Sequence, residues 1–378
     1  MQKNKLKPKI LFLVQLPPPV HGSSLVNKII VNNENVKSRY DIDIIEIQLA
    51  KNMEDLGNFS LMKIVNAFII FFKLLKNVVL KKHELAYLTI SPVGFAFYKD
   101  AILVFLIKIF SSVKIVFHIH GKGIKNEIKS NFKRKLYSFV FKNTEVIQLA
   151  EILYCDIKDI YHRKPYFLPN GIINTNIKKE SSIIKNDSVT FIYLSNLMEE
   201  KGILVFLKSI KLLQSFKKNL RVYVVGSSAD ITINYINDYL KENKIKNVKV
   251  LGPKYGEDKY FYLNKSDVFI LPTYYKNECF PLTILEAFQA GLAVISTNNG
   301  AIPDMVKNNI NGFIVPQNDS DALAEKMKYL IENVAILNKM KVKNKLEYSE
   351  KYTEDIFIEN YIKIIDQILA KKNGNNKI

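Results

Sequence analysis

The chain has 378 residues, of which 48% are apolar and 24% are charged. This composition excludes a disordered chain, and the length predicts two domains with large apolar cores. The two cysteines, Cys155 and Cys279, are too few for a disulfide framework or a cysteine-rich metal site. The formal net charge is +19, and residues 1–175 hold 26 basic against 13 acidic side chains. This basic half predicts an anionic partner (nucleic acid, phosphate-bearing substrate or membrane surface), unless it reflects only a lysine-rich composition.

The apolar segments are too short for an export signal or a membrane span. Ile10–Val14 has five apolar residues and is soon followed by prolines, so it is interpreted as a first buried strand. Ile64–Leu80 is interrupted by polar residues, and Ala101–Phe110 is ten residues long with a lysine inside it. A span needs about 20 apolar residues. We therefore expect a soluble or peripheral protein.

In the first half of the chain, short apolar runs alternate with longer helical patterns. Strands are expected at Lys9–Val14, Ile42–Ile47, Leu85–Thr89, Val113–His118, Glu145–Leu149 and Tyr166–Leu168. Helices are expected at Ser24–Asn33, Ser60–Leu80, Phe95–Phe110, Glu127–Phe141 and Ile152–Tyr161. This repeated alternation predicts right-handed crossovers and a parallel sheet.

Two of the helical segments are unusually basic and apolar. Met62–Lys82 has a wide apolar face edged by five lysines, and Asn126–Lys142 mixes basic with aromatic side chains. Such a composition is typical of a helix that lies in a membrane surface. The alternative is a helix packed on the protein, whose lysine side chains reach out to solvent.

The alternation restarts near residue 189, after the polar segment Asn170–Asp187, which we interpret as a linker. Strands are expected at Val189–Leu194, Arg221–Val225, Val248–Leu251, Val268–Leu271, Ala293–Ser296 and Gly312–Val315. Helices are expected at Gly202–Ser215, Thr232–Lys241, Asp258–Asn264, Pro281–Ala290, Ile302–Val306, Ser320–Asn333 and Thr353–Ala370. Ligands of such sheets bind beyond the carboxyl ends of the strands, so we expect functional residues just after strands.

The most informative motif is ECFPLTILE, which begins at Glu278 and ends at Glu286. If a helix begins near Pro281, its first amides are free to bind a phosphate. Glu286 inside that helix can accept two ribose hydroxyls, and Glu278 in the preceding loop can meet a sugar hydroxyl. By spacing alone, a surface glutamate and a salt-bridged glutamate explain the motif as well. Lys201, in SNLMEEKG after another strand, can hold a diphosphate as a point charge.

These motifs resemble the GT-B glycosyltransferases of the family 4 type, which are retaining enzymes that use nucleotide sugars. The resemblance covers nearly the whole chain and is most specific between Phe191 and Pro316. The matching elements are SNLMEEKG, VVGSS, LGPKYG, ILPTYYKNECFPLTILEAFQAGLAVISTNNGAIPDMV and NGFIVP. The resemblance implies an α/β fold of two Rossmann-like, doubly wound parallel-sheet domains that face a central cleft.

The same resemblance implies a division of the chain. Residues 1–172 are expected to form the acceptor-side domain, with residues 173–187 as a linker. Residues 188–350 are expected to bind the nucleotide sugar. Residues 351–378 are expected to form a helix that crosses back to the first domain.

The resemblance implies a role for each matching residue in the second half. The first glutamate, here Glu278, lies near the donor sugar hydroxyls in the family, and the second, here Glu286, binds the ribose. The lysine before the glycine, Lys201, binds the diphosphate. The family usually has an arginine five residues earlier, where this chain has Asn196; an amide donates hydrogen bonds without charge, so Lys201 carries more of the binding. The other donor-binding candidates in this half are Gly226, Phe280, Pro281, Leu282 and Thr283.

The first half agrees through a loop and a histidine. Gly22 and the amide of Ser23 match the family's glycine loop, which approaches the donor phosphates; the alternative is an ordinary turn with serine as the helix cap. His120 matches the family's histidine near the donor sugar, and His118 is expected to face the core. Neither histidine has the spacing of a zinc site. Glu278, His120 and Lys201 are thus the catalytic candidates.

Three weaker matches are set aside. Asp41-Ile42-Asp43 has the D-x-D form used by metal-dependent glycosyltransferases of the other fold, but it lies at the start of a strand. Gly121-Lys122-Gly123 lacks the third glycine of a dinucleotide-binding fingerprint. Cys279 has no partner that suggests a nucleophile and is expected to be a packing residue.

Together these observations predict a hexosyltransferase-type enzyme that moves a sugar from a nucleoside diphosphate sugar to a hydroxyl. The acceptor is expected to be a glycan on a lipid carrier, such as polyprenyl diphosphate, in bacterial capsule or O-antigen synthesis. We expect retention of configuration, no cofactor and no divalent metal, with no nucleic acid as partner. The basic, apolar first half predicts a cytoplasmic protein that is peripheral on the inner face of the cytoplasmic membrane.

Two alternatives stay open at this point. One is a non-catalytic, glycosyltransferase-like binding module with an anionic partner, either nucleic acid or membrane. The other is an epimerase or a phosphorylase of the same fold. The sugar and base of the donor, the acceptor and the linkage are not encoded in any motif that we identify.

Overall fold

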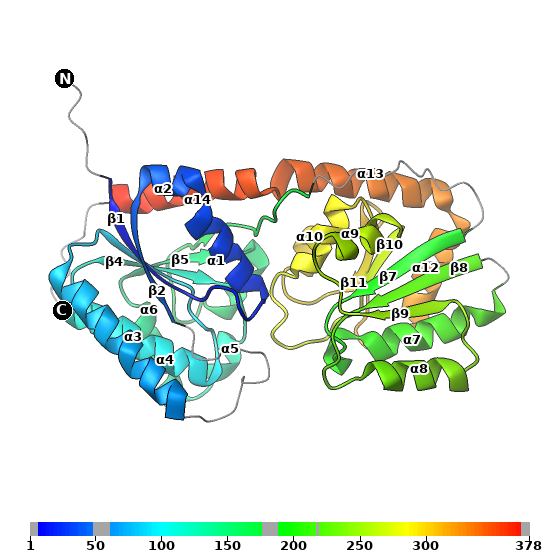
Figure 1. Cartoon of the computed structure of the whole chain (residues 1–378), viewed down its shortest axis with the longest axis horizontal. Coiled ribbons are helices and arrows are strands. Elements are labelled where there is room, and N and C mark those ends of the chain that lie inside the picture. Colours follow the sequence, from blue (N-terminus) through cyan, green and yellow to red (C-terminus); the bar gives the residue numbers. More distant parts are fainter. Residues whose placement is uncertain (1–6, 48–60, 176–187, 217–218, 372–378) are drawn as a thin grey trace, which may run out of the picture. The chain divides into compact units, whose positions relative to one another are not determined.

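The computed structural model describes residues 7–47, 61–175, 188–216 and 219–371 (Figure 1). The contacts divide the chain into two compact units. The first unit is Met1–Gly171 together with Glu354–Ile378, and the second unit is Ile172–Thr353. Most of the expected linker, residues 176–187, lies outside the described residues.

The first unit is built on a six-stranded parallel sheet in the order β2-β1-β3-β4-β5-β6. Its central strands are almost entirely buried, because parallel sheets are covered by helices on both faces. Every strand expected here is present within about two residues, which is the usual uncertainty of strand ends. The strands are β1 (Lys9–Val14), β2 (Asp41–Glu46), β3 (Leu85–Leu88), β4 (Lys114–Ile119), β5 (Thr144–Gln148) and β6 (Tyr166–Phe167).

The helices of the first unit correct three expectations. The expected helix Glu127–Phe141 is interrupted, because residues 128–130 leave the helical path and Ser130 has an extended backbone (ψ 130°). One helix ends at Glu127 and the next begins at Asn131. The expected helix Ile152–Tyr161 is a short 3₁₀ helix, Glu151–Asp156, followed by turns. A further helix follows the first one, because Asn33 accepts the Asn35 amide and starts a new helix. The helices are α1 (Gly22–Asn32), α2 (Glu34–Arg39), α3 (Leu61–Leu80), α4 (Gly94–Phe110), α5 (Ile124–Glu127), α6 (Asn131–Phe141) and α14 (Glu354–Ala370).

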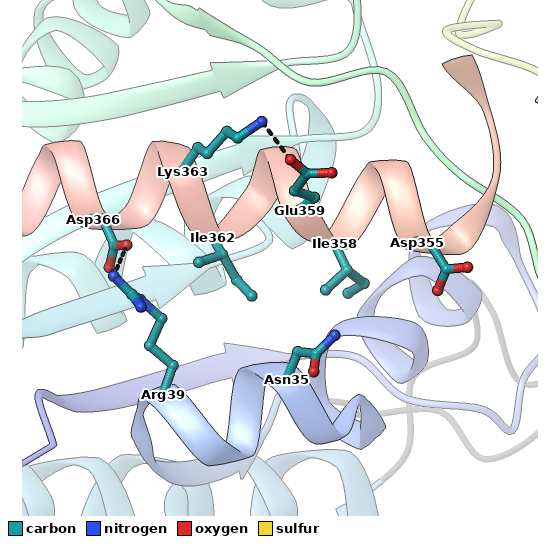
Figure 2. A pocket seen from close by; sticks show the side chains of 8 residues that line it. All are labelled: Asn35, Arg39, Asp355, Ile358, Glu359, Ile362, Lys363 and Asp366. Atoms are coloured by element: carbon teal, nitrogen blue, oxygen red, sulfur yellow. Dashed lines mark hydrogen bonds and ion pairs between the residues drawn. The ribbon is translucent and has the colours of Figure 1, made fainter. Parts of the chain in front are cut away.

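The last helix, α14, belongs to the first unit. Lys114 at the start of β4 donates from Nζ to the carbonyls of Ile368 and Leu369, at 3.1 and 2.8 Å, and so caps the end of α14. Part of α14 lies beside α2, where the Arg39 guanidinium pairs with Asp366 (Figure 2). The Tyr40 hydroxyl donates to the same carboxylate at 2.8 Å.

The second unit is built on another six-stranded parallel sheet, in the order β12-β11-β10-β7-β8-β9. The order runs outward in both directions from β7, as in Rossmann dinucleotide-binding domains. The topological switch point therefore lies between β7 and β10, and ligands of such sheets bind outside the strand ends there. The strands match those expected and are β7 (Ser188–Leu194), β8 (Asn219–Val225), β9 (Val248–Gly252), β10 (Val268–Leu271), β11 (Ala293–Thr297) and β12 (Gly312–Val315).

One helix of the second unit, α13, is absent from the sequence expectations. Only Leu337, Met340, Asn344 and Tyr348 of this basic helix are buried, so its apolar pattern is thin. Asn344 takes a buried position by donating to the carbonyls of Leu292 and Asn311, at 2.6 and 2.7 Å. The helices of this unit are α7 (Ile203–Leu212), α8 (Ile233–Glu242), α9 (Gly256–Asn264), α10 (Leu282–Gln289), α11 (Ile302–Met305), α12 (Ser320–Glu332) and α13 (Val334–Lys351).

Candidate functional site

The switch point of the second unit holds a partly buried ion pair. Lys201 follows β7 and Glu278 follows β10, and Lys201 Nζ lies 2.6 Å from Glu278 Oε2. The two side chains are only 17% and 7% exposed. Thr273 Oγ1 donates to the same carboxylate oxygen at 3.2 Å, and the Lys201 ammonium lies 4.7 Å from the ring centroid of Tyr275. The structure thus brings together two of the predicted catalytic residues and adds Thr273 and Tyr275, which no sequence pattern singled out.

Two glycines hold these strand-end loops against each other. Gly202 has a φ of +83°, and a Cβ there would lie 2.2 Å from the carbonyl oxygen of Pro272. Gly300 has a φ of +54°, and a Cβ there would lie 2.4 Å from the carbonyl oxygen of Glu278. Only glycine tolerates both the backbone conformation and the close approach. The positions of Lys201 and Glu278 therefore depend on backbone packing as well as on their own ion pair.

A second, partly buried pair joins α10 to α9. Glu286, the other glutamate of the motif, is 9% exposed, and its Oε1 lies 2.6 Å from Lys259 Nζ. Lys259 belongs to α9, and nothing in its sequence context marks it as a partner of Glu286. Burial raises the pKa of the neighbouring Tyr260, and the Glu286 charge adds to this effect. Both glutamates are thus held by a lysine, as far as the described residues show.

The start of α10 offers free backbone donors. Pro281 is the N-cap, one residue outside the helix rather than in its first turn, and no side chain caps the helix. Within the described part of the chain, the amides of Leu282 and Thr283 have no acceptor, as is usual for the first turn of a helix. Phe280 and Pro281 are buried, whereas Leu282 and Thr283 are half-buried. The helix dipole adds positive potential, so this end can bind an anion.

The structure gives the two other candidates of this unit different surroundings. Asn196 is exposed, and its carbonyl accepts the Met198 amide at 2.8 Å. Gly226 follows β8, and a Cβ there would lie 1.8 Å from the carbonyl oxygen of Ser195. The contact of Gly226 is therefore with the neighbouring loop backbone, where any side chain would collide.

In the first unit, the loop after β1 leads into α1 through a histidine cap. His21 is the N-cap, with its ring accepting the Ser24 amide while Ser24 Oγ accepts the His21 amide at 3.0 Å. The helix cap is therefore His21 rather than a serine, and the role of this loop toward a donor stays a prediction. Gly22 and Ser23 are the first two residues of α1, and their amides find no acceptor within the described residues.

His120, at the end of β4, is the least satisfied polar side chain of the first unit. Both of its ring nitrogens are buried and find no hydrogen-bond partner among the described residues. Burial lowers the pKa of His120 to about 3, with a smaller contribution from His21, so the ring is neutral. A buried polar group without a partner needs an explanation, and a bound ligand is one. The prediction for His118 is confirmed, because it is fully buried with Nδ1 lying 2.5 Å from the Tyr87 hydroxyl.

The features set aside from the sequence lie elsewhere. Asp41 and Asp43 lie in β2, and Asp43 pairs with Lys81 at 2.8 Å. Cys279 is buried, and Cys155 is exposed. In the part of the chain that the structure describes, no cluster of three or more His, Cys, Asp or Glu side chains is arranged to hold a metal.

Comparison with protein families decides what the second unit is. Residues 174–347 match the family described as glycosyl transferases group 1. The second unit is a glycosyl transferases group 1 domain. The match covers nearly all of Ile172–Thr353, including both lysine–glutamate pairs. This match agrees with the sequence-based resemblance to glycosyltransferases.

Curated relatives agree with this assignment. The chain is 26% identical to the capsular polysaccharide biosynthesis glycosyltransferase CapM of Staphylococcus aureus, over 53% of this chain and 52% of that protein. It is 22% identical to the O-antigen chain mannosyltransferase C of Escherichia coli, over 56% of this chain and 57% of that protein. The chain therefore spans just over half the length of these two relatives. It is 29% identical, over 70% of both chains, to a UDP-Gal:alpha-D-GlcNAc-diphosphoundecaprenol alpha-1,3-galactosyltransferase of Escherichia coli.

Solved structures extend the likeness to the whole chain. A glycosyltransferase from Rickettsia africae matches with a TM-score of 0.72 and 18% identity, over 97% of this chain and all of that one. Alr3699/HepE of Anabaena, solved in complex with UDP, matches with a TM-score of 0.72 and 16% identity, over 95% of this chain and all of that one. These neighbours are GT-B glycosyltransferases, so the predicted GT-B fold is confirmed.

Proposed function

We propose that the chain transfers a sugar from a nucleoside diphosphate sugar to a hydroxyl of a lipid-linked glycan, with retention of anomeric configuration. The observation that carries the proposal is the two partly buried lysine–glutamate contacts, Lys201–Glu278 and Lys259–Glu286, in a glycosyl transferases group 1 domain. The first contact lies at the switch point where such sheets bind nucleotides. The relatives named for capsule and O-antigen synthesis support bacterial surface polysaccharide as the product.

In the proposed complex, the diphosphate binds to lysine and backbone donors. A lysine ammonium has three donors, so Lys201 can pair with Glu278 and still donate to a phosphate oxygen. The free amides of Leu282 and Thr283 add a helix N-terminus. Gly22 and Ser23 begin α1 in the first unit and have free amides of the same kind, and their role toward the donor stays a prediction from the family resemblance. These groups make a divalent metal unnecessary for charge neutralisation in this proposal.

The carboxylates orient the two sugars of the donor. Glu286 accepts the ribose hydroxyls, and Lys259 at 2.6 Å holds this carboxylate in place. Glu278 accepts a hydroxyl of the transferred sugar, held by Lys201 and Thr273. The role of His120 stays a prediction from the family resemblance; its ring is neutral at physiological pH, because burial lowers its pKa to about 3. Asn196 supplies an uncharged donor at the position where the family resemblance implies an arginine.

The chemical step separates charge, and the site is arranged to stabilise it. As the bond to the diphosphate breaks, positive charge grows on the sugar ring and negative charge on the leaving group, as in other glycosyl transfers. Donors that are already in position stabilise the leaving diphosphate without reorganisation. The incoming acceptor hydroxyl then forms the new bond, and its proton leaves with the diphosphate.

The relatives suggest which donor to test first. HepE was solved with UDP and with UDP-glucose, and one relative is named for UDP-Gal. The mannosyltransferase relative shows that the sugar differs among similar proteins. The non-catalytic binding module is not favoured, because the relatives are named as glycosyltransferases and both lysine–glutamate pairs are intact.

Calorimetry with UDP, GDP and ADP in metal-free buffer tests the donor site. One nucleotide is expected to bind, and at 100 times its dissociation constant it stabilises the protein by about 2.7 kcal/mol. Glu286→Ala should abolish this binding. The control Glu359→Ala should leave it unchanged, because the Glu359 side chain on α14 is 66% exposed. Product analysis by NMR then reports the anomeric configuration. Failure of all three nucleotides to bind would refute the proposed donor site.

A further inference from the structure

The exposed side of α4 in the first unit is apolar. Ile102, Phe105, Ile109 and Phe110 are each between 49% and 57% exposed, and Phe95 is 93% exposed. Surface helices of soluble proteins place polar residues at such positions. The two lysines of α4 have other partners: Lys99 pairs with Asp100, and Lys108 donates to carbonyls at the end of α6.

The neighbouring helices extend this apolar surface. Helix α3 packs beside α4 (Figure 1) and exposes four apolar side chains three and four residues apart, so they share one face. Helix α6 adds Phe132, which is 74% exposed, and Phe139, whose ring centroid lies 5.9 Å from that of Phe105. We call this surface the apolar face; its residues are Val65, Phe68, Ile69 and Phe72 of α3, Ile102, Phe105 and Ile109 of α4, and Phe132 and Phe139 of α6.

Positive charge surrounds the apolar face. Residues 61–82, 94–110 and 125–142 together carry 13 lysines and arginines but only two acidic residues. Of these two, Asp100 is 1% exposed, and Glu127 pairs with Lys133 at 2.6 Å. Exposed basic residues stand on both flanks of the face, namely Lys73, Lys76, Lys81 and Lys82 near α3 and Arg134 and Lys135 on α6.

We propose that the apolar face docks the first unit on an anionic lipid bilayer, with its aromatic side chains inserted below the headgroups and its lysines among them. Charge complementarity selects this occupant, because a second copy of the chain would bring two rims of lysines together. In the part of the chain that the structure describes, no helix is long and apolar enough to cross a membrane, so the face lies on the bilayer. The inference builds on the proposed function, since a lipid-linked acceptor is presented at such a surface.

Sedimentation with vesicles tests the docking. The full chain should bind vesicles of equal parts phosphatidylglycerol and phosphatidylcholine, and bind vesicles of pure phosphatidylcholine much less. The double variant Phe72→Ser with Phe105→Ser should weaken the partition into anionic vesicles about tenfold or more. The matched control is Val342→Ser with Leu346→Ser, which alters two side chains of α13 that are 71% and 46% exposed, and should bind like the unaltered chain. Lys73→Gln with Lys76→Gln should weaken binding and flatten its salt dependence.

Tryptophan fluorescence gives a readout that does not depend on losing binding. The chain contains no tryptophan, so Phe72→Trp or Phe105→Trp introduces a single probe at an exposed aromatic position. Its emission should shift to the blue on adding anionic vesicles and should be quenched by brominated lipids. Leu346→Trp on α13 should show neither change.

Nucleotide binding separates this inference from the proposed function. A protein that binds a nucleoside diphosphate but no anionic vesicle would overturn the docking and leave the donor site standing. A protein that binds vesicles but no nucleotide would overturn the proposed donor site and leave the docking standing. Equal vesicle binding by the Phe72/Phe105 double variant and the unaltered chain would overturn the assignment of the face. A dimer that the same double substitution dissociates, without vesicle binding, would also overturn it.

Discussion

Replacing Lys201 by methionine removes the cation that lies 2.6 Å from the buried Glu278 carboxylate. Because Glu278 is only 7% exposed at its side chain, the carboxylate would remain desolvated without its partner. Breaking a buried pair in this way costs about 3–5 kcal/mol. Thr273 Oγ1 still donates to the carboxylate at 3.2 Å and offsets part of this loss. We therefore expect the lower end, about 3 kcal/mol of the free energy of unfolding.

Hydrogen exchange read by mass spectrometry measures this loss in the second unit alone, through the slow amides of β7 and β10. A double-mutant cycle with Glu278→Gln isolates the contact. The double variant should be more stable, by at least about 2 kcal/mol, than the sum of the two single losses predicts. Lys201→Met should also weaken nucleotide binding about tenfold or more, because a charge-assisted hydrogen bond to phosphate is lost. Lys328→Met is the control, since its partner Glu332 is 4.0 Å away and both are exposed.

Two results would refute the reasoning. If Lys201→Met left both the exchange of β7 and β10 and the nucleotide affinity unchanged, the ion pair would contribute neither stability nor binding. If the effects of Lys201→Met and Glu278→Gln simply added, the two groups would not interact in solution. Lys328→Met should lower the free energy of unfolding by at most about 0.5 kcal/mol, as is usual for exposed ion pairs.

Three further predictions concern single residues. Gly202→Ala should lower the melting temperature more than Gly94→Ala. Both glycines have positive φ, but only at Gly202 would the new Cβ collide with another atom, the carbonyl oxygen of Pro272 at 2.2 Å; equal decreases would contradict this. Lys114→Met should destabilise the first unit by about 1.5–3 kcal/mol in urea unfolding, since it leaves the carbonyls at the end of α14 unpaired, whereas Lys363→Met, which alters an exposed residue, should change little. The pKa of His120 in the folded protein, about 3, lies below the ordinary value for histidine, so on acidification the unfolded chain takes up a proton at this residue before the folded chain does. The free energy of unfolding is therefore highest above about pH 6.5 and falls as the pH decreases toward 3. Urea unfolding should show this contribution as about 2 kcal/mol between pH 7 and pH 5, and His120→Asn should remove that part of the slope; an unchanged slope would show that His120 does not carry it.

Much of the architecture was predictable because it depends on local patterns. All twelve strands that the structure describes were expected from the sequence, since a parallel sheet covered on both faces requires continuous apolar runs. The helix ends were less predictable. Local backbone geometry or a single polar contact decides them, as at the extended Ser130 between α5 and α6 and at the His21 ring that caps α1. Helix α13 was not predicted, because the polar side chain of Asn344 occupies part of its buried face and interrupts the apolar pattern.

The candidate site was predictable only in part. Glu278, Glu286 and Lys201 stand in motifs that point to nucleotide-sugar chemistry, and each follows a strand or lies in the next helix. Their partners could not be found in the same way. Lys259 meets Glu286 from another helix, and Thr273 reaches Glu278 across its own loop.

The sequence by itself determined the alternation of strands and helices, the two sheets and the glutamates of the donor motif, because hydrophobic periodicity and short motifs are local properties of the chain. The tertiary structure decided which charges meet and which apolar surfaces stay uncovered. Helix α4 shows the difference. Its residues are apolar on nearly every side, so no periodicity marks an outer face. Only the packing of α3, α6 and the sheet around it leaves Ile102, Phe105 and Ile109 in contact with solvent.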